Sequence, residues 1–340
     1  MTRTVISLVS GGLDSLLAAR LMQLQGLEVR PVHFISPWGC DEKAIANIEE
    51  QIGTPVVRVE KGADFIGVVR NPAHGYGRYM NPCIDCRIHM FRRMTPLARE
   101  LEAAAIVTGE VLGQRPMSQT RRQMRLIDRQ SGLGGMVLRP LSAKLLPPTE
   151  AELRGIVDRA SLYAFSGRGR TPQIALAARL GITRYDTPAG GCKLTTAGFV
   201  PKLRDFLGHY RDENMADARL LSYGRHFRLS HDVKVVLGRD KEENRLLEEY
   251  VTQTPGSLVS YTAYLPENFT GPTALACGPA SARVDEFAGQ AILRYARAQN
   301  VPTEGHTIRV ISAGGERLVP ASRPLTDEDA ARLRIGQGEP

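Results

Sequence analysis

The sequence has no long hydrophobic run. Its 340 residues contain no apolar stretch of the roughly 18 residues that a membrane-spanning helix needs. It also lacks a cleavable signal, because Met1–Val5 leads straight into the first apolar segment. We therefore expect a cytoplasmic protein without a membrane partner, and the length predicts two domains.

Cysteines are few and odd in number. The five are Cys40, Cys83, Cys86, Cys192 and Cys277. An odd count in a long chain without an export signal argues against a disulfide framework and favours metal binding or catalysis. Cys40 and Cys277 are interpreted as packing residues, since Cys277 falls within an apolar strand pattern.

Charge is distributed unevenly along the chain. Residues 211–340 contain 16 Lys and Arg against 18 Asp and Glu, whereas residues 1–210 contain 28 against 18. A basic amino-terminal part fits a partner with many phosphates, such as RNA, although a solvated basic surface gives the same balance.

The common phosphate-binding signatures are missing, since neither the P-loop lysine motif nor Gly-x-Gly-x-x-Gly occurs at the start of the chain. Instead, Ser10-Gly11-Gly12-Leu13-Asp14-Ser15 joins an apolar strand-like run to a helical pattern. Glycines let the backbone approach an anion, and the first N–H groups of a helix point at it with the helix dipole behind them. An ordinary turn also carries two glycines, but the complete motif after a first strand favours a pyrophosphate site.

Strand-like runs alternate with helical windows through the first half of the chain, which predicts βαβ units and a parallel sheet. The predicted strands are 4–10, 28–35, 55–60, 104–109 and 136–141, with a helix over 83–102. After about residue 211 the pattern changes to closely spaced strands with helices near 241–251 and 280–298. We therefore predict a doubly wound, mainly parallel α/β domain over 1–210 and a smaller α+β domain over 211–340. No internal repeat or low-complexity tract is present.

Three cysteines form a candidate site. Cys83 and Cys86 lie near a predicted helix N-terminus, where the local field favours thiolate, and Cys192 ends the glycine-rich segment 188–192. Tetrahedral zinc would need a fourth ligand such as His89. A redox disulfide of Cys192, an iron–sulfur cluster with one open iron and plain packing are the alternatives.

The segment Thr108-Gly109-Glu110, continuing through Gly113-Gln114 to Ser118-Gln119-Thr120, resembles tRNA 4-thiouridine synthetases, and Arg139-Pro140-Leu141 adds to that likeness. With residues 10–15 it indicates the PP-loop ATP pyrophosphatases, which have the adenine nucleotide alpha hydrolase-like fold. The cysteine pattern is also similar to that of tRNA 2-thiouridylases. Residues 235–244 resemble, more weakly, the RNA-binding domain of NFACT proteins.

The resemblance implies roles for particular residues. It implies that the pyrophosphate of ATP is bound by Ser10, Gly11, Gly12, Asp14 and Ser15. The nucleotide and uridine pocket is expected to contain Gly109, Glu110, Gly113, Gln114 and Ser118. Sulfur chemistry, and a [4Fe-4S] cluster or zinc as the metal, is expected at Cys83, Cys86 and Cys192. The expected catalytic residues are Cys83, Cys192 and Asp14.

The function implied is ATP-dependent tRNA uridine thiolation. The carbonyl oxygen would be adenylated and then displaced by cluster-bound sulfide or a cysteine persulfide, with Mg2+ at Asp14 and AMP and pyrophosphate as products. The 4-thiouridine likeness favours carbon 4. Sulfide or a cysteine desulfurase would donate the sulfur, and a homodimer is among the assemblies this interpretation allows. The alternatives are thiolation of a small molecule or cofactor, and RNA binding without catalysis.

Two features have a simpler interpretation as well. Asp14 is equally consistent with a helix cap. The arginines of residues 87–93 and 121–125 fit either a solvated helix face or contacts with the tRNA backbone.

Overall fold

The computed structural model describes residues 3–39, 42–185, 192–210, 215–253, 259–297 and 305–336. The chain divides into two compact units, Met1–Thr195 and Thr196–Pro340. The sequence placed the domain boundary after residue 210 instead. The difference arises because Lys202, in the helix after the division, donates hydrogen bonds to the carbonyl oxygens of Leu221 and Gly224, which ties that helix to the second unit.

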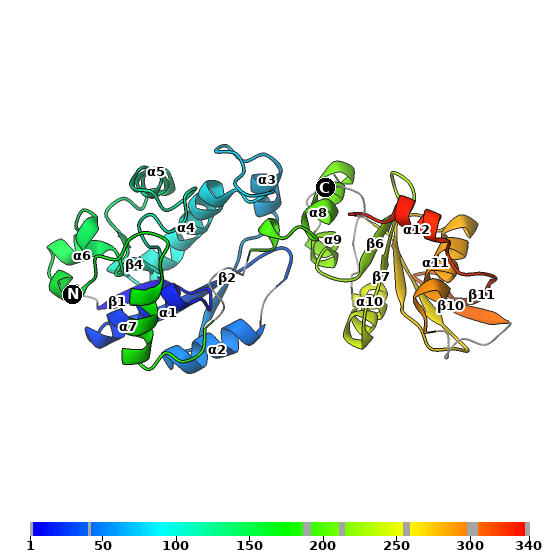
Figure 1. The fold of residues 1–340 in the computed structure, drawn as a ribbon, viewed down its shortest axis with the longest axis horizontal. Coiled ribbons are helices and arrows are strands. Elements are labelled where there is room, and N and C mark those ends of the chain that lie inside the picture. The colour runs from blue at the N-terminus through cyan, green and yellow to red at the C-terminus, as the bar shows by residue number, and fades with distance from the viewer. Residues whose placement is uncertain are drawn as a thin grey trace. The chain divides into compact units, whose positions relative to one another are not determined.

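The elements of the first unit alternate as the sequence predicts (Figure 1). Its strands are β1 (Thr4–Leu8), β2 (Glu28–Ile35), β3 (Val57–Glu60), β4 (Ala105–Thr108) and β5 (Val137–Leu138). Its helices are α1 (Leu13–Leu24), α2 (Glu42–Ile52), α3 (Asp64–Arg70), α4 (Cys83–Glu100), α5 (Arg121–Ser131), α6 (Glu150–Leu153) and α7 (Thr171–Arg179). A capping box of Thr149 and Glu152 begins α6, at the position where the threonine predicts a helix start.

The first sheet is parallel and has the strand order β3-β2-β1-β4-β5. Because side chains alternate along a strand, successive residues of β1 enter different cores. Val5 packs with α1, α2 and α7, whereas Ile6 packs with α4 and α5. Figure 1 shows these two groups of helices on opposite sides of the sheet. The prediction of a doubly wound α/β fold is confirmed.

The strand order places a topological switch point between β1 and β4. The chain leaves β1 for α1 on one face and leaves β4 for α5 on the other. In open α/β sheets, ligands bind beyond the carboxyl ends of the strands at such a point. The glycine loop after β1 and the segment starting at Gly109 after β4 both lie at this edge.

The second unit is an antiparallel sheet with helices on both faces. Its strands are β6 (Arg225–Arg228), β7 (Lys234–Leu237), β8 (Tyr261–Pro266), β9 (Ala274–Cys277), β10 (His306–Ser312) and β11 (Gly315–Ala321). They pair in the order β11-β10-β8-β9-β7-β6. Its helices are α8 (Val200–His209), α9 (Met215–Leu220), α10 (Lys241–Gln253), α11 (Ala282–Tyr295) and α12 (Asp327–Leu333).

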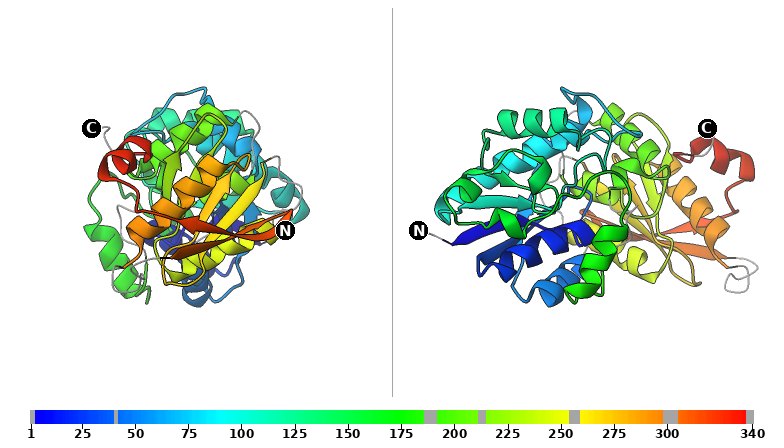
Figure 2. Two further views of the ribbon diagram at one scale, coloured as in Figure 1. Left: turned by 90° about the vertical axis from the view of Figure 1, so that its right-hand side faces the viewer. Right: turned by 60° about the vertical axis from the view of Figure 1, so that its left-hand side comes forward.

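Each face of the second sheet has its own core. Val235 packs under α11, which faces the viewer in the left view of Figure 2, and Val236 packs with α9 and α10. Cys277 is fully buried in the α10 core, so its interpretation as a packing residue is confirmed. Cys40 lies outside the described residues. In the described part of the chain, every helix is too short or too polar to cross a lipid bilayer.

Candidate active site

The glycine loop after β1 is shaped by its own hydrogen bonds. Gly11 has φ 81°, a backbone conformation that favours glycine. The Ser10 amide donates to Ser15 Oγ at 3.2 Å, and the Ser15 hydroxyl donates to the Gly12 carbonyl at 2.8 Å. The Ser15 hydroxyl therefore holds the loop closed in this structure. Gly12, the N-cap of α1, provides no side-chain cap, which leaves the first N–H groups of the helix open to an anion.

Asp14 lies in the first turn of α1 and faces the β4 side of the site. Its Oδ2 accepts a hydrogen bond from Gln114 Nε2 at 3.0 Å and lies 3.7 Å from the Arg170 guanidinium. Burial raises the pKa of Asp14, while Gln114, Arg170 and Arg115 oppose the rise. Its Oδ1 is buried and accepts no hydrogen bond from the described residues. One buried carboxylate oxygen thus has no donor among the described residues, which is compatible with a bound cation such as Mg2+, and the N-cap of α1 is Gly12 rather than Asp14.

Gly109 is where the β4 segment touches the glycine loop. A Cβ there would lie 2.4 Å from the carbonyl carbon of Asp14 and 2.4 Å from the amide nitrogen of Ser15. Only glycine permits this approach, because the opposing atoms are backbone. The first turn of α1 therefore rests directly on the end of β4.

The segment after Gly109 folds back toward the loop. Gly113 has φ 76°, and its amide donates to the Gln119 carbonyl at 2.7 Å. This turn carries Gln114 to Asp14. Ser118 is 4% exposed, so it supports the turn from inside.

Glu110 is 1% exposed and lies in a buried ion-pair network below the site. Its carboxylate contacts the Arg87 guanidinium at 3.0 Å and the Arg139 guanidinium at 2.9 Å, and Arg139 also donates two hydrogen bonds to Asp128. Burial alone would raise the pKa of Glu110, but Arg87 and Arg139 lower it. The sequence predicted Glu110 as a pocket-lining residue; its side chain instead fixes β4 to α4 and α5.

The paired thiols occupy the first turn of α4. The Asn81 side chain forms a hydrogen bond with the Cys83 thiol. Lys61, directly after β3, donates from Nζ to Cys86 Sγ at 3.3 Å. Burial and the neighbouring Cys86 raise the pKa of Cys83, despite Arg115 and Arg87. Burial therefore outweighs the helix field that the sequence predicted to favour thiolate at Cys83.

Cys192 joins the pair from a distant part of the sequence. Burial raises its pKa, Cys86 and Cys83 raise it further, and Lys61 lowers it. The three thiols thus act electrostatically on one another, and Lys61 acts on two of them. Within the described ranges, however, no three His, Cys, Asp or Glu side chains are close enough to hold a metal ion. Residues 188–191, which precede Cys192, lie outside those ranges.

The ring nitrogens of His89 interact with groups other than the three thiols. One ring nitrogen lies 2.8 Å from the Lys61 carbonyl oxygen, and the other lies 3.9 Å from the Asp64 carboxylate. Burial lowers its pKa. Both nitrogens have partners, which disfavours His89 as the fourth ligand of a zinc ion.

The thiols and the glycine loop lie at the same edge of the sheet. Lys61, directly after β3, contacts Cys86, and the glycine loop directly follows β1, so both are at the carboxyl ends of parallel strands. The positive charge of Arg115 opposes the rise in pKa of both Asp14 and Cys83. The sequence analysis did not single out Arg115 or Lys61. The signal for Lys61 was its position directly after a predicted parallel strand.

The arginines of α5 form a ridge on its outer face. Arg121, Arg122, Arg125 and Arg129 are exposed, and at 3.6 residues per turn they lie within an arc of about 100°. Arg121, Arg125 and Arg129 also line a cavity of about 470 Å³ beside Gly134. In contrast, Arg93 pairs with Asp64. We call these four α5 residues the arginine ridge.

Comparison with known proteins finds a family match in each of the two units. Residues 1–144 match the family model described as Thiamine biosynthesis protein (ThiI), and residues 224–332 match the one described as NFACT protein RNA binding domain. These matches confirm the resemblances predicted from the sequence.

Individual relatives cover part of the chain. The "Probable tRNA sulfurtransferase" of Thermococcus kodakarensis is 31% identical over 146 residues, 40% of this chain and 36% of the relative. That of Methanothermobacter thermautotrophicus is 28% identical over 172 residues, 48% of this chain and 41% of the relative. A solved 4-thiouridine synthetase–RNA complex with bound ATP is 21% identical, covers 53% of this chain and 51% of that chain, and has a TM-score of 0.33. The chain thus spans less than half the length of these two curated relatives.

Proposed function

We propose that this protein uses ATP to adenylate a uridine carbonyl oxygen in tRNA and then replaces that oxygen with sulfur. The observation that carries the proposal is that the glycine loop directly follows β1, while Lys61, directly after β3, contacts Cys86. Both groups therefore lie at the carboxyl edge of one parallel sheet, as adenylation followed by sulfur attack requires. The sulfurtransferase relatives support the same reaction class.

In the adenylation step, the uridine oxygen attacks the α-phosphorus of ATP and pyrophosphate leaves. The open N–H groups of α1 are placed to stabilise the charge that builds on the pyrophosphate, since preorganised donors act most strongly where charge develops. Asp14 would hold Mg2+ through its open Oδ1. Gln114 keeps the carboxylate oriented by binding the other oxygen.

In the sulfur step, sulfur attacks the activated carbon and AMP leaves. Cys83, Cys86 and Cys192 are of the type that holds a [4Fe-4S] cluster, which with three protein ligands leaves one iron open to sulfide. A Cys192 persulfide would deliver sulfur without a metal. Its outer sulfur would bond to the activated carbon as AMP leaves, and the Cys83 or Cys86 thiol would then cleave the S–S bond, forming a disulfide with Cys192 that an external thiol reductant would reduce. Lys61, which contacts Cys86 and acts on Cys192, would stabilise negative charge on sulfur in either case.

The second candidate is thiolation of a small molecule or cofactor by the same chemistry. The match of residues 224–332 to an RNA-binding domain favours tRNA. Non-enzymatic RNA binding is disfavoured by the intact glycine loop beside the thiols. The sulfur donor, the cytoplasmic location and a homodimer stay predictions.

The test is to incubate the protein with ATP, a sulfur donor and an unmodified tRNA transcript, and to measure pyrophosphate release and thionucleosides. We expect tRNA-dependent pyrophosphate release and 4-thiouridine in the digested tRNA. Thiolation at carbon 2 would correct the position only. Pyrophosphate release that does not depend on tRNA, with no thionucleoside formed, would favour thiolation of a small molecule or cofactor.

The arginine ridge is expected to contact the tRNA backbone. Arg121→Gln combined with Arg122→Gln should lower tRNA affinity about tenfold and reduce the slope of log affinity against log salt by about 1.5, because two phosphate contacts are lost. Fluorescence anisotropy across salt concentrations measures both. The matched control, Arg99→Gln with Arg154→Gln, removes two exposed arginines of the same unit and should stay within about twofold. If the salt slope of the Arg121→Gln, Arg122→Gln variant equals that of the wild type, the arginine ridge does not contact the tRNA backbone.

The metal content separates the roles proposed for the thiols. Anaerobically purified protein is expected to contain iron and acid-labile sulfide, and Cys192→Ala should lose both because three thiolates are needed. Cys277→Ala, which removes the buried thiol of the second unit, should retain them. Zinc without iron, or a Cys192 disulfide without metal, would overturn the cluster while leaving adenylation in place.

A further inference from the structure

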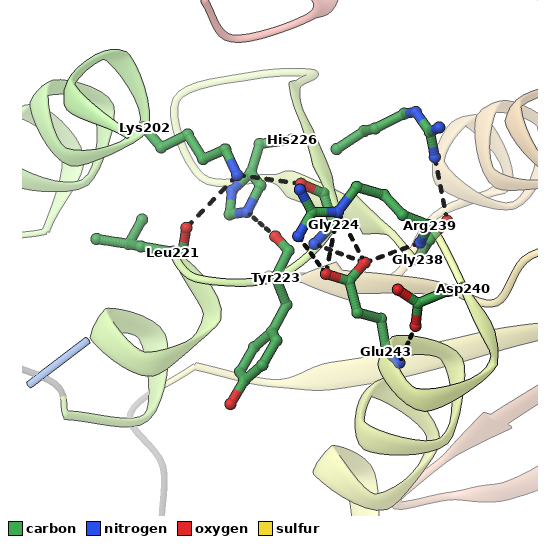
Figure 3. A network of polar contacts seen from close by, with 10 residues as sticks. Lys202, Leu221, Tyr223, Gly224, His226, Gly238, Arg239, Asp240 and Glu243 are labelled. Carbon is green, nitrogen blue, oxygen red and sulfur yellow. Dashed lines mark hydrogen bonds and ion pairs between the residues drawn. The ribbon is translucent and has the colours of Figure 1, made fainter. Parts of the chain in front are cut away.

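The second unit contains a concentration of positive charge at one end of its sheet, although residues 211–340 carry more acidic than basic residues. Figure 3 shows its central part. The cationic recess, as we name it, consists of Lys202 on α8, Arg225 on β6, Arg239 before α10 and Arg334 after α12. These four residues come from four separate segments.

Lys202 lies at the centre of the recess. Its Nζ donates to the carbonyl oxygens of Gly224 at 3.1 Å and Leu221 at 3.5 Å. These two acceptors take two of the three protons of the ammonium group. Neither acceptor carries a full negative charge, so the charge of Lys202 is solvated by backbone dipoles without a direct counter-ion in these contacts.

Arg225 and Arg334 lie on segments that adjoin these acceptors, and Arg225 directly follows Gly224. Arg334 is held by a backbone bridge to Phe227, and its charge acts on Lys202. Arg225 donates to the Gly238 carbonyl at 3.3 Å and lies over the Tyr295 ring at 4.7 Å. Both guanidiniums are half-buried, and their charge is not matched by a carboxylate in these contacts.

The nearby carboxylate of Glu243 already forms hydrogen bonds and an ion pair within the protein. It accepts the amides of Gly224 at 3.2 Å and Arg239 at 2.9 Å, and it forms an ion pair with the Arg239 guanidinium. Asp240 caps the same helix by accepting the Glu243 amide at 3.0 Å. The acidic residues of segment 238–244 therefore build the start of α10, and the charge of the recess remains positive.

A second layer of basic groups lies beneath. His226 and Lys234 are both buried, at 1% and 0% exposed, and Lys234 Nζ has no hydrogen-bond partner among the described residues. Burial and the charges of Arg239, Arg334 and Lys234 together lower the pKa of Lys202 to about 8, while Glu243 opposes them. Burial and the charges of Lys202 and Lys234 also lower the pKa of His226, which stays neutral.

We propose that the cationic recess binds one phosphate of an RNA backbone. An ammonium with a spare proton and the nearby guanidinium of Arg334 are suited to a compact anion with several acceptor oxygens, because arginine binds phosphate through a planar fork of donors. The RNA-binding match of residues 224–332 includes Arg225 and Arg239, and Lys202 and Arg334 lie outside its bounds.

This inference concerns RNA binding by the second unit and rests on the proposed function only in naming tRNA as the RNA. Its test omits ATP and sulfur. If no thiolation is found, the proposal that the cationic recess binds RNA still stands. If the recess does not bind RNA, the proposal of adenylation still stands.

The experiment measures binding of the full-length protein to a tRNA transcript by fluorescence anisotropy. Arg334→Gln should weaken binding about tenfold and reduce the salt slope by about 0.7 to 0.9, the share of one phosphate. Lys202→Gln should do the same, and Arg334→Gln guards against misfolding of the more buried lysine variant. Arg283→Gln removes an exposed arginine at the start of α11 and should match the wild type.

Two readouts identify the ligand. Wild-type affinity should fall severalfold as pH rises through about 8, because Lys202 loses its proton, and Lys202→Gln should flatten this decline. The recess is excluded if Arg334→Gln retains the affinity and salt slope of the wild type, or if Arg283→Gln loses as much. Stabilisation by inorganic phosphate that Arg334→Gln abolishes, with unchanged tRNA binding, would indicate a free-anion site and overturn the proposal.

Discussion

Gly109→Ala is expected to lower ATP affinity about 100-fold, the scale of effect that a displacement of about 1 Å produces at a preorganised site. The new Cβ would lie 2.5 Å or less from backbone atoms of Asp14 and Ser15. Backbone atoms cannot rotate away as a side chain can. The first turn of α1 must therefore move, and with it the N–H groups that would hold the pyrophosphate.

The measurement is titration calorimetry with ATP, alongside thermal unfolding. Overpacking should also cost about 1–3 kcal/mol of stability, which leaves a folded protein whose binding can be measured. Gly134→Ala is the matched control, since a Cβ at Gly134 meets nothing within 4 Å. Wild-type ATP affinity in Gly109→Ala would show that this contact does not set the geometry of the loop.

Local patterns predicted most of the fold. An apolar run bounded by turn residues predicted β2 over 28–35, which the structure reproduces residue for residue. β11 was not predicted, because Gly315–Ala321 is largely exposed and pairs only with β10 at the sheet edge. An edge strand with little burial has no hydrophobic alternation to read.

Long-range contacts account for what the sequence did not predict. The glycine loop is a local motif and was found, whereas Lys61 and Arg115 become conspicuous only when the strand ends meet at one sheet edge. Glu110 was predicted to line the pocket because of the resemblance to 4-thiouridine synthetases, and nothing near it in the sequence indicates its ion pairs. Its partners Arg87 and Arg139 reach it from α4 and from the end of β5.

Glu110→Gln is expected to lower the free energy of unfolding of the first unit by about 3–5 kcal/mol, the usual cost of removing one member of a buried charge network. Arg139 is 4% exposed and would retain only Asp128 as an ionic partner. Arg87 would lose the carboxylate 3.0 Å from its Nε. A neutral amide cannot replace either interaction, since it offers one acceptor oxygen and no charge.

Urea unfolding followed by tryptophan fluorescence measures this loss in the first unit alone. Trp38 is the only tryptophan of the chain, and it is 3% exposed. The exposed Glu100→Gln on α4 should change stability by no more than about 0.5 kcal/mol.

The pH dependence follows from the lowered pKa of Glu110. Folding stabilises the ionised carboxylate, so its contribution is complete above the unfolded pKa of about 4.3 and decreases as pH falls toward the folded pKa. The difference between wild type and Glu110→Gln should therefore narrow below about pH 4. A difference that is the same at pH 7 and at about pH 3, or smaller than about 1 kcal/mol at pH 7, would mean that the ion pairs of Glu110 do not hold β4 between α4 and α5.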